Sequence, residues 1–236
     1  MPLDILALAA HRDDVEQTCA GTLLKMAERG YRTGILDLTQ GEMGTRGTAE
    51  DRAREAADAA RILKVSWRRA LDIPDGRVEN TWENRLKVAA VIREQRPRVL
   101  ILPYWEGRHP DHYTASILGY EAAFLSGLAR LPHDGSAHRP FKIIYASLYR
   151  DVRPTFVVDI TGQFETRFQA LMAYKSQFTD QDAGSGIFPA QKEIRARVES
   201  MARYHGMLGG VTYAEPFVQK EVGLVDDVMA IPVKSI

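Results

Sequence analysis

The sequence predicts an α/β fold: a Rossmann-like three-layer sandwich with a mostly parallel sheet between two layers of helices. Two observations support this class. Short apolar runs alternate with longer segments whose apolar residues recur every three or four positions, which is the pattern of a β-α-β-α chain. The apolar runs are nearly uninterrupted and are followed by polar residues or glycines, as is typical of buried parallel strands.

The first strand–helix unit spans residues 3–29. Residues 3–10 are mostly apolar and are followed at once by polar residues, which predicts a buried strand. The next apolar residues recur at helical spacing: Val15, Cys19, Leu23 and Met26. We therefore expect one helix over residues 15–29, ending before Gly30.

Three further units are expected before residue 130. A strand over 31–38 leads through the Gly-rich loop TQGEMGTRGT into an Ala-rich helix over 49–63. A short strand at 70–73, the loop PDGRVEN and a helix over 81–95 form the next unit. The last consists of the very apolar strand 99–103, the loop YWEGRHPDHY and a helix over 111–127. This repetition predicts a parallel sheet.

The second half of the chain is less regular. The expected strands and helices are 142–149, 155–160, 162–178 and 190–205. Pro, Gly and Ser predict a loop at 131–141, and residues 180–189 are the best candidate for a mobile connection. We interpret residues 1–236 as a single domain, with a βα core over 1–130 and an irregular elaboration over 131–236.

Composition excludes several classes of protein. The 236 residues are 45% hydrophobic and 26% charged, which is ordinary for a globular protein. Because 31 basic residues balance 31 acidic ones, we expect no binding of nucleic acid or of an anionic membrane. The single cysteine, Cys19, excludes an intramolecular disulfide and a zinc site with several thiolates. The N-terminal residues lack a signal-peptide pattern, so we expect a cytoplasmic protein.

Three of the six histidines lie in the loops after the first and fourth expected strands. Because the carboxyl ends of parallel strands meet at one edge of the sheet, these loops face each other if the two strands are neighbours. One loop offers His11 and Asp14, and the other offers His109 and His112. Two imidazoles and one carboxylate form a known ligand set for catalytic zinc, and Fe(II) uses the same set. The sequence therefore predicts a metal site without fixing the ion.

The acidic residues also have a structural interpretation. Asp13 or Asp14 could cap the helix after the first strand, and Asp111 could cap the helix that follows Pro110. Such caps stabilise a helix by about 0.5–2 kcal/mol. Capping does not require histidine, however, so the joint occurrence of the two motifs favours a metal site.

These motifs resemble those of the PIG-L/LmbE deacetylases, zinc enzymes that remove N-acetyl groups from substrates containing N-acetylglucosamine (GlcNAc). The family's AHPDD-type stretch with a nearby Glu appears here as AHRDDVE, and its HPDH motif appears within RHPDH. Longer segments are most similar to the bacillithiol-biosynthesis branch, which deacetylates N-acetylglucosaminyl-malate: DLTQGEMGTRGT, IPDGRVENTWENR, RPRVLILPY, TFVVDI, YKSQF and VTYAEPF.

The resemblance implies a role for each residue of the two motifs. His11, Asp14 and His112 would be metal ligands, and Asp13 would be the general base that takes a proton from the attacking water. His109 would be the cation that stabilises the oxyanion, oriented by Asp111. The resemblance thus implies a zinc-dependent amide hydrolase that releases acetate and a free amine. It also implies a homo-oligomer, with hexamers among the family's forms.

The sequence departs from the family pattern at Arg12, where the family usually has proline. This change removes no ligand, although it frees the backbone of the turn. A positive charge at this position could also lower the pKa of the neighbouring carboxyls.

Four arginines and one glutamate are candidates for binding the substrate. Arginine suits a carboxylate such as that of malate, and the candidates are Arg46, Arg52, Arg108 and Arg139. Arg52 and Arg139 match recurrent family positions, and Arg108 adjoins the HPDH motif. Glu42 could orient a sugar hydroxyl. Each of these residues could instead be a solvated surface charge.

The remaining reactive residues are assigned structural places. We expect Cys19 in the core and Lys175 in a structural or interfacial role, whereas His133, His138 and His205 lack ligand spacing and are expected on the surface or in loops. Two alternatives to the bacillithiol-type function remain. One is deacetylation of another GlcNAc-containing substrate. The other is a non-catalytic sugar- or nucleotide-binding module, although the first turn lacks the G-x-G-x-x-G fingerprint of dinucleotide binding.

Overall fold

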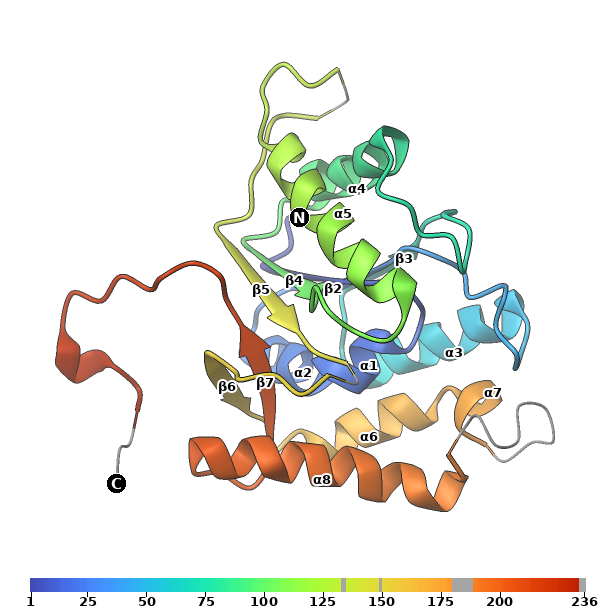
Figure 1. Ribbon diagram of the computed structural model, residues 1–236, viewed down its shortest axis with the longest axis vertical. Coiled ribbons are helices and arrows are strands. Elements are labelled where there is room, and N and C mark those ends of the chain that lie inside the picture. Colours follow the sequence, from blue (N-terminus) through green and yellow to red (C-terminus); the bar gives the residue numbers. More distant parts are fainter. Residues whose placement is uncertain (133–134, 149, 180–188, 234–236) are drawn as a thin grey trace.

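The computed structural model describes residues 1–132, 135–148, 150–179 and 189–233. A seven-stranded sheet crosses the molecule in the order β3-β2-β1-β4-β5-β7-β6 (Figure 1). Its strands are β1 (Ile5–Ala9), β2 (Thr33–Asp37), β3 (Trp67–Ala70), β4 (Val99–Pro103), β5 (Lys142–Ala146), β6 (Phe156–Asp159) and β7 (Ala214–Val218). The first five strands pair in parallel, whereas β7 is antiparallel to both β5 and β6. The predicted α/β class with a mostly parallel sheet is confirmed.

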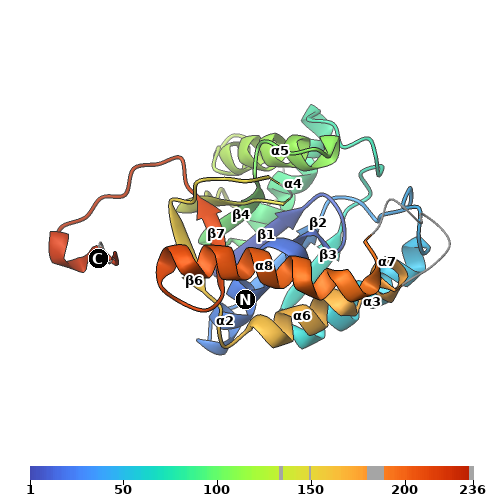
Figure 2. The ribbon, with the colours of Figure 1, turned by 60° about the horizontal axis from the view of Figure 1, so that its bottom comes forward.

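Helices cover both faces of the sheet (Figure 2). They are α1 (Asp14–Thr18), α2 (Ala20–Glu28), α3 (Ala49–Ile62), α4 (Trp82–Gln95), α5 (Pro110–Ser126), α6 (Phe164–Met172), α7 (Lys175–Phe178) and α8 (Gln191–Gly209), with a short 3-10 helix η1 (Val228–Ala230). α4 and α5 lie on one face, and α1, α2, α3 and α6 lie on the other. α8 packs against β6 and β7. Among the described residues, no helix is long and apolar enough to cross a membrane.

The alternation of side chains along β1 divides the core between the two faces. Leu6 and Leu8 belong to the cluster formed with α4 and α5, whereas Ile5, Ala7 and Ala9 belong to the cluster formed with α1 and α2. Because both faces are covered, the whole strand is apolar. This explains why its end stands out in the sequence as an abrupt change to polar residues.

The connection of the strands creates the crevice in which the candidate residues lie. β1 pairs with β2 on one side and with β4 on the other, with Ile5 opposite Val99. The predicted neighbourhood of the first and fourth strands is therefore confirmed. The helices that follow β1 and β4 leave on opposite faces, so the strand order reverses here, and open α/β sheets bind their ligands at such a point.

The expected helix over residues 15–29 is in fact two helices. Cys19 breaks it, and α2 begins anew with the carboxylate of Glu215 at its N-terminus, where Glu215 accepts bonds from the backbone N–H groups of Gly21 (2.8 Å) and Thr22 (2.7 Å). Glu215 belongs to β7, a strand that the sequence did not predict.

Other boundaries also differ from the prediction. The third strand is at Trp67–Ala70 instead of 70–73, since it pairs with β2 from Gly34 onward. The helix expected over 162–178 is divided into α6 and α7 near Tyr174, whose hydroxyl reaches buried Glu16. Of the connection expected at 180–189, residues 180–188 lie outside the described residues.

Candidate metal centre and active site

The turn after β1 holds one residue in an unfavourable backbone conformation. Asp13 has φ 101° and ψ −17°, in the left-handed region that non-glycine residues seldom occupy. The side chain of Asp13 makes no capping bond to α1. The side chain of Asp14 accepts a hydrogen bond from the backbone N–H of His11 (2.9 Å). The alternative interpretation of Asp13 as a helix cap is therefore wrong. Strain of this kind costs about 1–3 kcal/mol and clusters at functional sites.

Three predicted ligand residues form a compact triangle of donor atoms. His11 Nδ1 lies 3.2 Å from His112 Nε2 and 3.6 Å from Asp14 Oδ2, and His112 Nε2 lies 3.3 Å from Asp14 Oδ1. A tetrahedral ion with bonds of about 2.0–2.1 Å separates its ligand atoms by about 3.3–3.4 Å. The contacts of His11 and His112 use different oxygens of Asp14, and each of the three separations is close to that value.

The other nitrogen of His11 is held by two carboxylates. His11 Nε2 lies 3.1 Å from Asp111 Oδ2 and 3.1 Å from Asp75 Oδ1. A carboxylate on the second nitrogen of a metal-binding imidazole orients the ring and raises its basicity. Asp75 was not among the predicted site residues, although it follows the third strand at the same edge of the sheet.

The Asp111 contact corrects one prediction. Asp111 was expected to orient His109, but its carboxylate contacts His11 and accepts bonds from the N–H groups of Gly76 (2.9 Å) and Val78 (3.2 Å). His109 itself caps α5, because its Nδ1 accepts the backbone N–H of Asp111 (3.2 Å). Histidine can thus serve as a cap here, and its Nε2 remains the nitrogen that can carry the proton.

The pKa shifts within the cluster follow from burial and from the facing carboxylates. Burial alone would lower the pKa of His11, but its bonds with Asp111, Asp14 and Asp75 raise it to about 12. Burial opposes ionisation of Asp14 as well, yet His112 and His11 hold its pKa well below the usual range. For His109, burial and the two other imidazoles lower the pKa, which favours the neutral ring over the cation that the resemblance implies.

Asp13 stands apart from the other carboxylates because its partner is an arginine. Arg52, buried in α3, contacts Asp13 Oδ1 through Nη2 at 3.1 Å and also donates to the carbonyl oxygen of Arg12. Burial raises the pKa of Asp13, Arg52 opposes the rise and nearby Asp14 adds to it, with a result of about 7. Arg52, a predicted substrate-binding residue, therefore forms an ion pair with Asp13, the expected general base.

The charged side chain of Arg12 has a structural role. Its side chain is buried, and its Nη1 donates to the carbonyl oxygens of Ala49 (2.8 Å) and Gln40 (3.3 Å). Its guanidinium thus fastens the strained turn to the loop before α3, where a proline would offer no such bond. The expected effect on the neighbouring carboxyls is not seen, because Arg12 is not among the main charges that shift the pKa of Asp13 or Asp14.

A buried ion network lies beneath the site. Arg68 of β3 donates to both oxygens of Asp37 (2.8 and 3.0 Å) and to Glu16 (2.6 Å), and Tyr174 donates to the same Glu16 oxygen (3.2 Å). Glu16 lies on α1, two residues after Asp14, which is expected to be a metal ligand. The network therefore holds α1 against β2, β3 and the segment between α6 and α7 that carries Tyr174.

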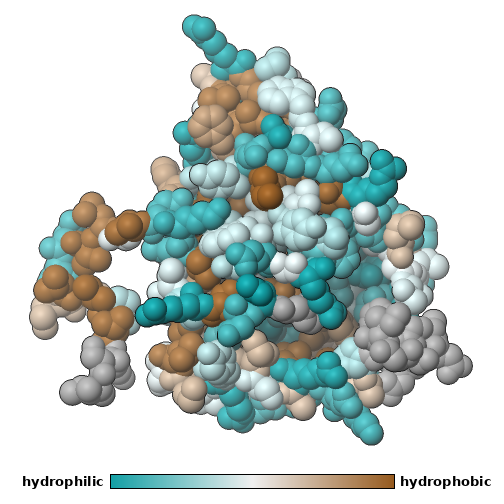
Figure 3. Space-filling view, in the orientation of Figure 1, coloured by the Kyte–Doolittle hydropathy of each residue, from teal (hydrophilic) through white to brown (hydrophobic). Residues whose placement is uncertain are grey.

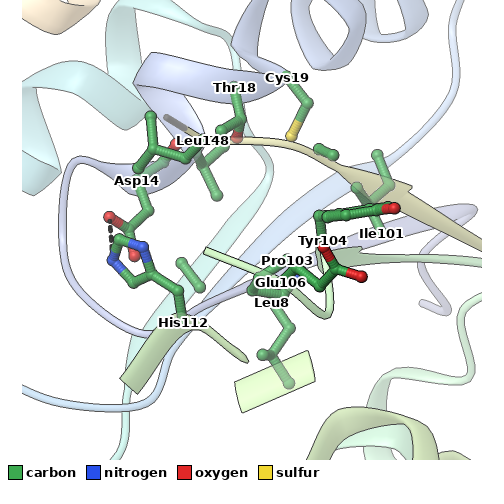
Figure 4. Close-up of a pocket in the computed structure, with 13 residues that line it drawn as sticks. Leu8, Asp14, Thr18, Cys19, Ile101, Pro103, Tyr104, Glu106, His112 and Leu148 are labelled. Atoms are coloured by element: carbon green, nitrogen blue, oxygen red, sulfur yellow. Dashed lines mark hydrogen bonds and ion pairs between the residues drawn. The ribbon is translucent and has the colours of Figure 1, made fainter. Parts of the chain in front are cut away.

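A small cavity opens beside Asp14 and His112 (Figure 4). It has a volume of about 20 Å³ and is lined by Asp14 and His112 at one side and by Cys19, Thr18 and Leu148 at another. A space of this size holds about one water molecule. Cys19 is buried there with a raised thiol pKa, so the prediction that it belongs to the core is confirmed.

The other predicted substrate residues lie in different places. Arg108 is exposed in the loop between β4 and α5, next to the cluster. Glu42 accepts the N–H of Asp75 (2.8 Å) and so fastens the loop that carries Asp75. Arg46 is buried and donates to the carbonyl oxygens of Gln177 (3.1 Å) and Thr179 (3.4 Å), which gives it a structural position between its loop and the α7 region.

Arg139 is remote from the cluster. It donates to the carbonyl oxygen of Phe124 (3.1 Å) and lies over that ring, near the C-terminal end of α5. The cluster lies at the N-terminal end of this helix, whose 17 residues span about 25 Å. Within one chain, Arg139 therefore lies far from the cluster.

The histidines outside the motifs are only partly as expected. His138 lies in a loop and bonds to the carbonyl oxygen of Pro97 (2.7 Å), whereas His133 lies outside the described residues. His205 was expected on the surface or in a loop but is buried in α8, where it bonds to the carbonyl oxygen of Met201 (2.9 Å). A polar side chain on a helix can be buried in this way when its nitrogen has a backbone hydrogen-bond partner. Lys175 is exposed at the start of α7.

The donor chemistry of the cluster fits a divalent cation. Within the part of the chain that the structure describes, two groups of side chains could hold an ion, one made of His11, His109 and His112 and one of His11, Asp75 and Asp111. Together with Asp13 and Asp14, four carboxylates surround these imidazoles, and the cation Arg52 contacts Asp13. A divalent ion would offset the excess negative charge. Imidazole and carboxylate ligands suit Zn²⁺ and Fe²⁺ alike.

The structure is thus an α/β protein with a Rossmann-like sheet, whose switch-point crevice holds His and Asp side chains that could bind a metal ion. The GlcNAc-PI de-N-acetylase family, PIG-L, matches residues 6–123. The chain belongs to this family. Its relatives include the diacetylchitobiose deacetylase of Thermococcus kodakarensis, which is 31% identical over 224 residues, with 89% of this chain and 80% of that protein covered.

Two further relatives agree with this membership. The 1D-myo-inositol 2-acetamido-2-deoxy-alpha-D-glucopyranoside deacetylase of Kineococcus radiotolerans is 26% identical over 291 residues, with 91% of this chain and 81% of that protein covered. The crystal structure of the conserved protein TT1542 from Thermus thermophilus superposes with a TM-score of 0.85 at 40% identity, with 95% of this chain and 98% of that chain covered. The fold is therefore that of known structures.

Proposed function

We propose that this protein is a metal-dependent N-deacetylase that hydrolyses the acetamide of a GlcNAc conjugate, with N-acetylglucosaminyl-malate of bacillithiol biosynthesis as its substrate. The observation that carries the proposal is the triangle of His11, Asp14 and His112 donor atoms, with edges of 3.2–3.6 Å. Two relatives that are named as deacetylases of GlcNAc-type sugars support the substrate class.

His11, Asp14 and His112 would hold the metal, with zinc as the proposed ion and Fe²⁺ as the alternative. When bound, such an ion polarises the acetyl carbonyl and lowers the pKa of a water molecule. Asp75 and Asp111 keep the His11 ring in position from the side opposite to Nδ1. Proton transfer and stabilisation of the oxyanion are assigned to the side chains of Asp13 and His109.

Asp13 would move the proton. It adjoins the ligand Asp14 in the chain, and Arg52 fixes one of its oxygens at 3.1 Å. Its carboxylate would take a proton from the attacking water and return it to the nitrogen of the departing amine, which leaves as a free glucosamine-type amine. The left-handed backbone of Asp13 directs this carboxylate away from the capping position that it would otherwise occupy.

His109 would stabilise the oxyanion as a neutral donor. Because its Nδ1 accepts the N–H of Asp111, the proton of the neutral ring is on Nε2. An N–H donor at that nitrogen stabilises a developing negative charge without a full positive charge on the ring. This role replaces that of the cation expected from the family resemblance.

The cavity beside the triangle would select the acyl group. Its volume of about 20 Å³ is of the size that a small group such as the methyl of an acetyl group requires. For the other end of the substrate, exposed Arg108 is the proposed partner of a carboxylate such as that of malate.

The experiment that tests this function measures acetate release from four substrates: N-acetylglucosaminyl-malate, free GlcNAc, diacetylchitobiose and GlcNAc-inositol. We expect the malate conjugate to give the highest kcat/KM. A preference for another substrate would keep the deacetylase and remove the bacillithiol assignment. Binding of these sugars without any acetate release from the metal-loaded protein would instead favour the non-catalytic binding module.

A matched variant separates substrate recognition from chemistry. Arg108→Gln should lower kcat/KM for the malate conjugate and leave that for free GlcNAc nearly unchanged, because only the former carries the carboxylates. Arg139→Gln is the control, since Arg139 lies at the far end of α5. Equal losses on both substrates for Arg108→Gln would contradict the proposed contact.

A further inference from the structure

The loop between β2 and α3, residues 39–48, is fastened to α7, which lies more than 120 residues further along the chain. Gln177 of α7 donates through Nε2 to the carbonyl oxygen of Arg46 (2.7 Å), and Arg46 donates through Nη1 to the carbonyl oxygen of Gln177 (3.1 Å). The two residues are 6% and 5% exposed. We call this reciprocal pair of hydrogen bonds the α7 clasp. It fixes the C-terminal end of the loop.

The clasp has a closely packed base. Gly47 has a φ of 71°, and a side chain at this position would meet the Cβ of Ser176 at 2.6 Å. Glycine therefore suits both the backbone conformation and the space at this point of the loop. Ser176 in turn donates to Glu55 of α3 through its backbone N–H (2.6 Å) and its hydroxyl (2.7 Å). α7 is thus anchored on α3, beside which it lies in Figure 1.

Hydrogen bonds, not apolar packing, determine the conformation of this loop. Its sequence, TQGEMGTRGT, contains one large apolar residue, Met43, which is 74% exposed. The surface of the body is largely hydrophilic in Figure 3, and such a surface offers a polar loop little apolar area on which to pack. Loss of a buried hydrogen bond leaves a polar group without a partner, which water cannot easily replace. The buried bonds of the clasp are therefore well placed to hold the loop.

The other end of the loop holds Asp75. Glu42 accepts the backbone N–H of Asp75 through Oε1 (2.8 Å), and the backbone N–H of Met43 donates to Asp75 Oδ2 (3.0 Å). The second carboxylate oxygen, Asp75 Oδ1, lies 3.1 Å from Nε2 of His11. The loop therefore fixes both the backbone of Asp75 and the carboxylate oxygen that is turned towards the imidazole.

We infer that Glu42 and Gln177 are positioning residues for the metal centre. Gln177 fixes the loop, the loop with Glu42 directs Asp75, and Asp75 orients His11. Partners of a metal-binding imidazole tune the affinity for the ion, and continuous chains of hydrogen bonds can carry such an effect across a protein. The inference rests on the proposed function in one respect, that His11 is a metal ligand.

This role differs from the sugar contact considered for Glu42. Its hydrogen bond to the backbone of Asp75 requires an acceptor oxygen and not a negative charge. Glu42→Gln should therefore keep the metal affinity of the wild type, whereas Glu42→Ala should lower it. A residue that only contacts the substrate would change KM and leave metal affinity in the absence of substrate as it is.

The test measures the dissociation constant for Zn²⁺ by competition with a chelator, without substrate. We expect Glu42→Ala and Gln177→Met each to weaken binding by about threefold to tenfold, and Glu42→Gln to stay within about twofold of the wild type. Gln95→Met is the matched control and should have no effect. Gln95 is also buried, at 9% exposure, but its amide donates to Glu94 on α4 (2.8 Å).

Unchanged affinity in Glu42→Ala, or a loss in Glu42→Gln equal to that in Glu42→Ala, would overturn the inference. An equal loss in Gln177→Met and Gln95→Met would also overturn it, because the effect would then be one of general stability. Circular dichroism checks that each variant is folded. Glu42 is exposed, so its variants keep the test decisive if Gln177→Met does not fold.

A double-mutant cycle tests whether the two residues act through Asp75. In the background of Asp75→Ala there is no carboxylate to direct, so Glu42→Ala and Gln177→Met should cause no further loss of Zn²⁺ affinity. Losses that multiply would overturn the inference. A wild type that binds no Zn²⁺ would remove the proposed metal centre together with the inference, whereas a wild type that binds it as tightly as Glu42→Ala and Gln177→Met would remove the inference alone.

Discussion

Replacing Arg68 with methionine is expected to destabilise the folded protein by about 3–5 kcal/mol, because it leaves two buried carboxylates without their cation. Arg68 donates to both oxygens of Asp37, at 2.8 and 3.0 Å, and to Glu16 at 2.6 Å. The side chains of Asp37 and Glu16 are 1% and 0% exposed, so water cannot replace the lost bonds. Methionine fills much of the volume of arginine but donates no hydrogen bond.

The loss should be visible in both chemical and thermal unfolding. For a chain of this length, about 3–5 kcal/mol corresponds to a fall in Tm of roughly 6–20 °C.

The neighbouring arginine on the same strand provides the control. Arg69 also pairs with a carboxylate, Glu94, at 2.9 Å, but these side chains are 44% and 48% exposed. Arg69→Met should therefore cost less than about 1 kcal/mol. Urea unfolding of both variants gives the two free energies of unfolding. Equal losses, or a loss below about 1 kcal/mol for Arg68→Met, would refute the reasoning that burial makes this ion network important.

Three further predictions concern the site. Cys19 should resist iodoacetamide in the folded protein and react after unfolding, because burial raises the pKa of its thiol; mass spectrometry that finds rapid labelling of the folded chain would contradict this. Asp75→Asn should weaken metal binding about 10–100-fold in competition with a chelator, since it removes one of the two carboxylates on His11, and an unchanged affinity would remove Asp75 from the site. Asp13→Gly should be more stable than Asp13→Ala by about 1–2 kcal/mol, because glycine adopts a φ of 101° without strain, and the opposite order in thermal unfolding would show that the left-handed turn is not strained.

The parts of the site that were predicted from the sequence depend on short-range patterns. An apolar run that stops at His11 identifies the end of a buried strand, and the spacing of His11 and Asp14 is local. The two loops meet because β1 and β4 are neighbours, which parallel α/β topology favours. The sheet class and the proximity of His11, Asp14 and His112 could therefore be predicted from the sequence.

The missed features depend on contacts between distant residues. Asp75 lies in a Pro-Asp-Gly turn, where aspartate is common for reasons of turn geometry alone, so nothing local distinguishes its role at His11. The break at Cys19 depends on Glu215, which is almost 200 residues away in a strand that contains Pro216. Proline within a run argues against a strand, which explains why β7 was not predicted.

Arg12 illustrates how the structure changes the meaning of a residue. From the sequence it was a departure from the family proline with a possible electrostatic effect on the carboxyls. In the structure it binds two backbone carbonyl oxygens, of Gln40 and Ala49, and so holds the strained turn by hydrogen bonds. Proline would restrain this turn through its ring, whereas Arg12 restrains it through the hydrogen bonds of its guanidinium.

The central proposal is that the metal ligands His11, Asp14 and His112 are distinct from the general base, Asp13. Its most direct test measures metal content and acetate release together in wild type, Asp13→Asn and His112→Ala, after each protein is offered Zn²⁺ and freed of excess metal. The account predicts that Asp13→Asn keeps the metal of the wild type and loses nearly all turnover, whereas His112→Ala loses both. Equal loss of metal in the two variants, or turnover that survives in Asp13→Asn, would contradict it.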